Sequence, residues 1–240
     1  MRRLTLAFLI LPLVLFSHAW ADIEPALKDL IPLYTIENID GAEQVWVQKS
    51  GSTNWVSAKE GNNLEEGDSI KAGSHTTVVL CLSKDTFVQV SEKTILQVKQ
   101  LTEQGDMGFL TRLSLIAGHI LSDVRKNLGQ SGSSFEVESG GVVCGVRGTV
   151  FEVSNNMGDV EATTHEGAVE LKGSNGTQTV KAGETCHCHH GQSQWKKPCS
   201  SHAMNRFATW KARKAACLAR RANPHAPRHS NSSRPHTTHH

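Results

Sequence analysis

The chain has 240 residues, of which 38% are hydrophobic and 20% charged, and its formal net charge at pH 7 is +2. This composition excludes a collagen-like chain, a fully disordered chain and a polytopic membrane protein. The length suits one large domain or two small ones. Aromatic residues make up only 5%, whereas there are 20 glycines, a composition that favours β-strands joined by turns.

The charge is distributed unevenly along the chain. Residues 22–183 carry 13 Lys and Arg against 22 Asp and Glu, whereas residues 184–240 carry 10 basic residues against one acidic residue. Nine of the 13 histidines also lie in the second segment. The sequence therefore predicts an acidic body and a basic, histidine-rich tail that attract each other.

The N-terminus has the three parts of a secretory signal peptide. Met1-Arg2-Arg3 is basic, residues 4–16 are almost entirely apolar, and Ala19-Trp20-Ala21 fits a signal peptidase site. An uncleaved anchor is the alternative, but the apolar run is shorter than the roughly 20 residues that span a bilayer. We therefore expect a signal peptide over residues 1–21 and a mature protein in the periplasm or cell envelope of a bacterium.

The middle of the chain is typical of short strands. Residues 22–44, with two prolines, are expected to form an irregular or briefly helical lead-in. From residue 45, apolar alternation recurs every 8–12 residues between turn-forming residues. Residues 107–126 fit a helix or two strands around Gly118, and we favour the strands. The prediction is an all-β domain over residues 45–185, either a β-solenoid or a β-sandwich.

Several segments, in order, resemble the FecR domain family. The most specific is Val146-Arg147-Gly148-Thr149-Val150-Phe151, which is similar to the family's V-R-G-T-x-F motif. Gly67-Asp68 fits the family's early Gly-Asp turn, and Glu166-Gly167 fits its closing turn. The remaining segments with a family counterpart are residues 55–56, 64–73, 77–82, 91–98, 113–124, 135–139 and 180–184. The resemblance covers roughly residues 45–185.

This resemblance implies a periplasmic β-rich domain. In the best-known member, that domain senses the loaded state of an outer-membrane iron transporter and signals to a cytoplasmic sigma factor. That role uses a cytoplasmic segment and a transmembrane helix, which are not expected here. The chain instead resembles free-standing exported FecR-domain proteins, for which a role in interactions is implied. The residues expected to carry the structural motif are Gly67, Asp68, Val146, Arg147, Gly148, Thr149, Phe151, Glu166 and Gly167.

One residue of the motif is charged within an apolar run. Arg147 lies in the expected strand over residues 142–153, where an unpaired charge would be costly to bury. A structural ion pair with Glu138, Glu152 or Glu166 is favoured over a contact with a ligand or partner.

No catalytic motif is present in the sequence. It has no Gly-x-Ser-x-Gly elbow, no His-Glu-x-x-His pair and no phosphate-binding glycine loop. His75 and His165 are isolated, and His119 lies within an expected strand and turn. All three are expected to be exposed or capping residues rather than general bases. The sequence therefore predicts a protein that is not an enzyme.

A Cys/His-rich linker is expected over residues 186–199. Cys186, His187, Cys188, His189, Cys199 and His202 are candidate ligands for zinc, copper or haem iron. In an oxidising compartment the same thiols can instead form disulfides, for example Cys199 with Cys217, or stay unpaired. Disulfides are favoured among the three.

Residues 200–222 predict the only helix, capped by Ser200 or Ser201. Its expected apolar face is Met204, Phe207, Ala208, Ala215 and Leu218. Docking on the acidic body is favoured over peripheral contact with an anionic membrane, and nucleic acid is not an expected partner. Residues 223–240 are expected to be a disordered, histidine-rich tail.

The leading functional hypothesis is a non-catalytic exported module without a cofactor. It would bind a protein partner or an envelope polymer through the acidic body, as part of a signalling system. The alternative is an envelope protein that binds a metal or haem through the Cys/His cluster.

Overall fold

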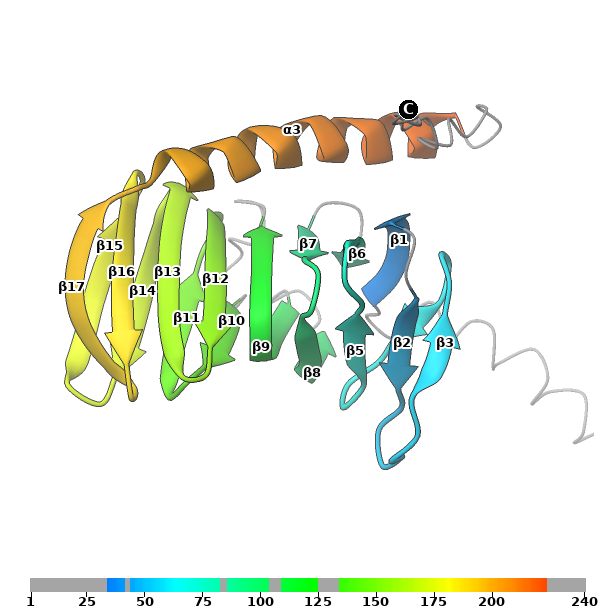
Figure 1. The fold of residues 1–240 in the computed structure, drawn as a ribbon, viewed down its shortest axis with the longest axis horizontal. Helices are drawn as coiled ribbons and strands as arrows, with labels where there is room; N and C mark the ends of the chain where they lie inside the picture. The colour runs from blue at the N-terminus through cyan, green and yellow to red at the C-terminus, as the bar shows by residue number, and fades with distance from the viewer. Residues whose placement is uncertain (1–33, 42–43, 83–85, 104–108, 125–133, 224–240) are drawn as a thin grey trace, which may run out of the picture.

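A computed structural model describes residues 34–41, 44–82, 86–103, 109–124 and 134–223. The predicted signal peptide and all but the first residue of the predicted C-terminal tail lie outside these residues. The described chain is mostly strand, with one helix near the C-terminus, which confirms the all-β prediction (Figure 1).

The elements follow one another in the described chain as short, mostly hairpin-connected strands. They are β1 (Tyr34–Gly41), β2 (Val45–Gln48), β3 (Val56–Ala58), β4 (Asn63–Leu64), β5 (Ser69–Ala72), β6 (Thr76–Leu82), β7 (Thr86–Val90), β8 (Ile95–Glu103), β9 (Phe109–Asp123), β10 (Ser134–Ser139), β11 (Val142–Val146), β12 (Val150–Asn156), β13 (Asp159–Glu166), β14 (Ala168–Gly173), β15 (Gly176–Lys181), β16 (Glu184–His189), β17 (Gln192–Pro198) and α3 (Ser201–Ala222).

The strands form two layers that share β9. Sheet A has the order β4-β1-β6-β7-β9-β12-β13-β16-β17. Sheet B has the order β3-β2-β5-β8-β9-β10-β11-β14-β15. The hairpins β6–β7, β12–β13 and β16–β17 lie in sheet A, whereas β2–β3, β10–β11 and β14–β15 lie in sheet B. Neighbouring strands are antiparallel except β9 and β10.

The strand β9 passes from one layer to the other at Gly118. Residues up to Ala117 pair with β8 in sheet B, and residues from Gly118 pair with β12 in sheet A. Gly118 has φ 96°, and a Cβ there would lie 2.6 Å from Thr94 Cα. The prediction of extended structure in this segment is therefore confirmed, but the described residues form one bent strand rather than two strands around a turn.

The hydrophobic core lies between the two layers. Each strand alternates, so that in β12 Phe151 and Val153 face the core whereas Val150 and Glu152 face outward. Phe151 meets Phe135 of sheet B edge to face, with ring centroids 6.2 Å apart. Sheet A is therefore apolar on its inner side and free to carry another element on its outer side.

Two expected boundaries are wrong. The predicted irregular lead-in contains β1, which pairs with β6 and buries Tyr34 and Ile36 in the core. The predicted Cys/His-rich linker forms β16 and β17, which extend sheet A beyond β13. In both segments the apolar residues alternate at the period of a strand.

The helix α3 runs along the outer side of sheet A and crosses its strands (Figure 1). Ser200 is its N-cap, and the Ser200 Oγ accepts a hydrogen bond from Ala203 N at 3.2 Å, as the sequence predicts. The predicted apolar face is wrong in part, because Met204 and Leu218 are exposed. The side chains that α3 buries are Ala203, Phe207, Trp210 and Cys217. No helix in the described part of the chain is long and apolar enough to cross a membrane.

Candidate functional site

The main candidate site is the outer side of sheet A beneath α3, which we call the helix-covered face. Its apolar side chains and the side chains of α3 that meet them are Val79, Cys81, Phe87, Leu121 and Val150 on the sheet and Phe207, Trp210 and Cys217 on the helix. The Phe87 and Trp210 rings meet edge to face at 6.1 Å. These contacts form a second hydrophobic cluster, separate from the core between the sheets.

A buried carboxylate lies under the N-terminal half of the helix. Glu152 in β12 is only 2% exposed. Its Oε2 accepts hydrogen bonds from Arg206 Nε and His119 Nε2, both at 2.9 Å. Its Oε1 accepts from His165 Nε2 at 2.8 Å. Burial raises the pKa of Glu152, but the hydrogen bonds from the two imidazoles and the guanidinium outweigh it and hold that pKa well below its usual range.

The two histidines differ in the surroundings of Nδ1, the ring nitrogen that does not contact Glu152. His119 Nδ1 lies 2.9 Å from Ser91 Oγ, so a neutral His119 donates to Glu152 and accepts from the serine. The His165 side chain is fully buried and stacks on Phe207 with ring centroids 4.4 Å apart. Its Nδ1 has no hydrogen-bond partner among the described residues. The prediction that these histidines are exposed or capping residues is therefore wrong.

The middle of α3 is anchored by a second acidic residue. Asp123 at the end of β9 accepts hydrogen bonds from Trp210 Nε1 at 3.1 Å and from Lys214 Nζ at 2.7 Å. Asp123 is 8% exposed, so this carboxylate is shielded by the helix.

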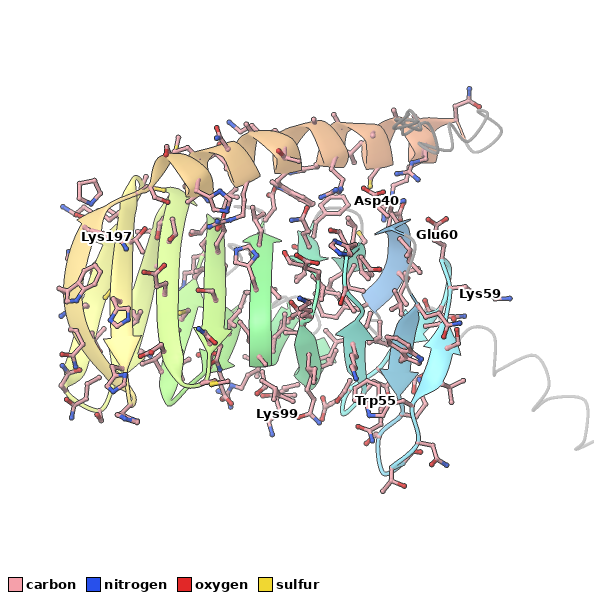
Figure 2. All side chains as sticks on the ribbon, viewed as in Figure 1. Asp40, Trp55, Lys59, Glu60, Lys99 and Lys197 are labelled. Carbon is pink, nitrogen blue, oxygen red and sulfur yellow. The ribbon has the colours of Figure 1, made fainter. Side chains whose placement is uncertain are left out.

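The C-terminal half of α3 is paired with β1 and β7. Arg213 donates to Gln89 at 2.6 Å and to Asp40 at 3.0 Å, and Figure 2 shows Asp40 just below this part of the helix. Arg221 forms a bidentate pair with Glu37 at 2.8 and 2.9 Å, which raises the pKa of Arg221. The prediction that the basic helix docks on the acidic body is confirmed.

A cleft of about 660 Å³ opens beside the first turns of α3. Its lining includes His75, Glu92, His119, His202 and Arg206. His119 and Arg206 are both hydrogen-bonded to Glu152, so the cleft leads from solvent toward the buried carboxylate.

The Gly67-Asp68 turn is a tightly bonded corner. Asp68 is 1% exposed and accepts hydrogen bonds from Lys49 Nζ at 2.5 Å and Ser50 N at 2.9 Å. Gly67 has φ 89°, and a Cβ there would lie 2.3 Å from Ser50 Oγ. Both residues therefore hold the β4–β5 connection against β2.

The Val146–Phe151 motif forms the crossing from sheet B to sheet A. Val146 and Phe151 are buried, and Thr149 Oγ1 donates to Ala168 O at 3.0 Å. Gly148 and Gly167 have φ 69° and 80°, and a Cβ on Gly167 would lie 3.0 Å from Gly148 O. Here the two turns of the motif pack on each other.

Arg147 does not form the ion pair predicted for it. It is exposed at the bend between β11 and β12, and within the described residues no carboxylate pairs with it. Glu152 is instead bound by the helix, Glu138 pairs with Arg112 at 3.2 Å, and Glu166 pairs with Lys211 at 3.6 Å.

The structure separates the predicted metal ligands. Cys186 and Cys188 point from β16 into the core, whereas His187 stacks on Trp195 and His189 pairs with Asp159, both on the outer side. Cys199 is half-buried before α3, and His202 is exposed on its first turn. In the described residues, no three His, Cys, Asp or Glu side chains are arranged to hold a metal ion.

The six cysteines all lie in the described residues, and no disulfide joins any two of them. The predicted Cys199–Cys217 bond is wrong, because the intervening helix rises about 1.5 Å per residue and places the two about 24 Å apart. Burial raises the pKa of Cys144 to about 12, with a further contribution from nearby Cys186. Hydrogen bonding to Cys186 raises the pKa of Cys188 as well. Cys144 and Cys188 thus lie in the core as protonated, apolar groups.

Two crystal structures of a candidate anti-sigma factor from Parabacteroides distasonis ATCC 8503 are similar to this chain. They are 16% and 15% identical to it, with TM-scores of 0.47 and 0.48. Each comparison covers 58% of this chain and 64% or 63% of the solved chain, so the match spans less than two thirds of the solved proteins. A comparison with curated proteins finds no match.

A family model described as FecR protein matches residues 68–170, from Asp68 in the first turn to β14. This range contains β9, which both sheets share, and the whole Val146–Phe151 motif. Residues 68–170 therefore match the FecR family model, and the resemblance seen in the sequence is confirmed over that range.

Proposed function

We propose that this protein is an exported, non-catalytic FecR-domain module that binds a protein partner in cell-envelope signalling. The observation that carries the proposal is the FecR match over residues 68–170. FecR-domain proteins act in signalling, which they carry out by contact with other proteins. An envelope polymer is the alternative ligand class, and it would use the same surface.

The fold supports this role by presenting two broad outer surfaces on a rigid two-layer scaffold. The outer side of sheet A carries α3, whereas the outer side of sheet B displays alternating charges. Arg112 there is 2.8 Å from Glu136 and 3.2 Å from Glu138, and Lys71 lies over the Trp46 ring at 5.6 Å. Arginine and tryptophan are enriched in protein-binding surfaces.

Photo-crosslinking in the source bacterium tests the proposal. A photoreactive residue replaces the exposed Lys99, and a matched control places it at the adjacent Val98, which is 1% exposed. The expected result is one crosslinked envelope protein from position 99 and none from position 98. No crosslink from Lys99, or from an equivalent exposed position on each outer surface, would contradict a partner-binding role.

Export is tested separately by fractionation of the tagged full chain. We expect a periplasmic form shortened by residues 1–21. Retention of the full-length form in the cytoplasm would contradict this part of the proposal.

The alternative function is metal or haem binding. Among the described residues no ligand set is assembled for it, since β16 turns its thiols and imidazoles to opposite sides. Metal analysis of the purified, reduced protein tests it. Stoichiometric metal that disappears in Cys186→Ser/Cys188→Ser would establish the alternative.

A further inference from the structure

We propose that the helix-covered face is a docking groove for a basic amphipathic helix of a protein partner, and that α3 occupies this groove while the partner is absent. The inference rests on the function proposed above and adds a second contact surface for the partner, on the opposite side of the sheets from Lys99.

The charges of the groove are spaced along one line. Glu152, Asp123 and Glu37 pair with Arg206, Lys214 and Arg221 of α3. These basic residues are separated by eight and seven positions, about 12 and 10 Å along a helix, so they lie on one side of it. The groove therefore recognises a basic residue on every second turn.

The apolar part of the groove has a matching pattern. Phe207 and Trp210 are three positions apart and bury their rings against Val150, Leu121 and Phe87. An aromatic pair at this spacing, between basic residues, is a typical anchor of a helix in a groove. The structure thus shows a complete set of contacts for one helix of this chemistry.

α3 can leave the groove without disturbing the sheets. Its backbone hydrogen bonds stay within the helix and its caps, and only two residues, Cys199 and Ser200, connect it to β17. It buries four of its 22 residues. Its polar contacts include hydrogen bonds from Trp210 to Asp123 and from Arg213 to Gln89. The others are ion pairs with partly exposed basic side chains, which salt screens.

An empty groove would expose Phe87, Leu121 and the Glu152 carboxylate to water, so replacement of α3 by a second helix is favoured over simple opening. The acidic residues exclude an anionic membrane as the occupant, because like charges repel. The occupant is therefore a basic helix that belongs to the partner protein.

Binding of a labelled peptide to the full mature chain tests the proposal. The probe is a fluorescein-labelled peptide with the sequence of residues 200–222, and its affinity is measured by fluorescence anisotropy. Two variants loosen α3 by different routes, Phe207→Ala through the apolar contacts and Arg213→Ala/Arg221→Ala through the ion pairs. Met204→Ala is the matched control, since Met204 is on the exposed side of α3 and 48% exposed.

We expect both loosened variants to bind the probe about tenfold or more tightly than the wild type, because occupation of the groove by α3 lowers the apparent affinity. Met204→Ala should bind like the wild type. Glu152→Gln added to either loosened variant should weaken probe binding. Far-UV circular dichroism verifies that the strands persist, and if one loosened variant unfolds, the other decides the result.

Equal probe affinity in the wild type and in the folded loosened variants would overturn the inference. A concentration-dependent wild-type dimer with exchanged helices, detected by light scattering, would also overturn it, since the occupant would then be a second copy of the chain. The two proposals fail separately. Capture of a partner at Lys99 without a gain in probe binding contradicts only the groove, whereas a gain in probe binding without any captured partner contradicts only the signalling role.

Discussion

Trp210 in α3 donates a hydrogen bond from Nε1 to Asp123 Oδ2 at 3.1 Å, although 87 positions separate the two residues in the sequence. The same oxygen accepts from Lys214 at 2.7 Å, and the indole ring meets Phe87 edge to face. One side chain thus joins the helix to both the apolar and the acidic part of the helix-covered face.

Trp210→Ala should lower the free energy of unfolding by about 3 kcal/mol, because it removes a fully buried aromatic side chain and leaves a cavity. Urea unfolding followed by circular dichroism measures the loss. Trp55→Ala is the control, since Trp55 is 38% exposed and its removal should change stability by no more than about 0.5 kcal/mol. Similar losses for the two variants would show that α3 does not dock through Trp210.

Glu152→Gln should lower the free energy of unfolding at pH 7 by about 2 to 3 kcal/mol, because the charge-assisted hydrogen bonds from Arg206 and the histidines are weakened. The pKa of Glu152 is depressed in the folded protein, so its contribution is present above the unfolded value of 4.5 and is lost as pH falls through the folded pKa. The difference between wild type and variant should therefore shrink below about pH 4.5.

Urea titrations at pH 7, 4.5 and 3 measure this difference. Glu166→Gln is the control, because Glu166 is 57% exposed and its pair with Lys211 is 3.6 Å long. A difference for Glu152→Gln that stays constant over this range would refute the buried, ionised state of Glu152.

Cys144 should make the fold sensitive to alkali. Its pKa is raised from 9.0 to about 12 by burial, so folding favours the neutral thiol. The stabilisation is complete below pH 9 and is lost as pH rises toward 12, by up to about 1.4 kcal/mol per pH unit. In Cys144→Ala, the slope of unfolding free energy against pH should be shallower between pH 9 and 12. Identical slopes for wild type and variant would mean that water reaches this thiol.

Gly118→Ala should be much more destabilising than Gly158→Ala. The two glycines have nearly equal φ values, 96° and 94°, so the backbone strain of a Cβ is similar, about 1 to 2 kcal/mol. At Gly158 the Cβ meets nothing within 4 Å, whereas at Gly118 it would lie 2.3 Å from Thr94 Oγ1. Thermal unfolding of both variants measures how much the close approach of β9 to Thr94 adds to the loss of stability. Equal losses of stability in the two variants would argue against that close approach.

Elements with local signals could be predicted from the sequence. The short strands follow from apolar alternation between turns, and α3 follows from Ser200 and the residues after it. The apolar face of the helix is harder to predict, because alanines on every side of the helix weaken the hydrophobic pattern. Ala203, Trp210 and Cys217 are the buried positions that the expected face omits, and all three fall on the Phe207 side at helical spacing.

The Glu152 cluster could not be predicted, because its members are 33, 13 and 54 positions from Glu152. No spacing rule joins residues from β9, β13 and α3 until the order of the strands is known. The separation of thiols from imidazoles in the Cys/His segment, in contrast, can be predicted from the sequence. Alternate residues of a strand face opposite sides, so a strand through Cys186-His187-Cys188-His189 separates thiols from imidazoles.

The sharing of β9 between the layers has a consequence for biogenesis. The chain is synthesised from its N-terminus, so β1–β8 can assemble first. One edge of β7 and one edge of β8 then stay unpaired until β9 is synthesised. Unpaired edges of this kind attract other extended chains. Once β9 is in place it closes both edges at once and offers the template on which β10 and β12 add. Synthesis that stalls after β8 would therefore release a chain with two unpaired strand edges, which favours aggregation.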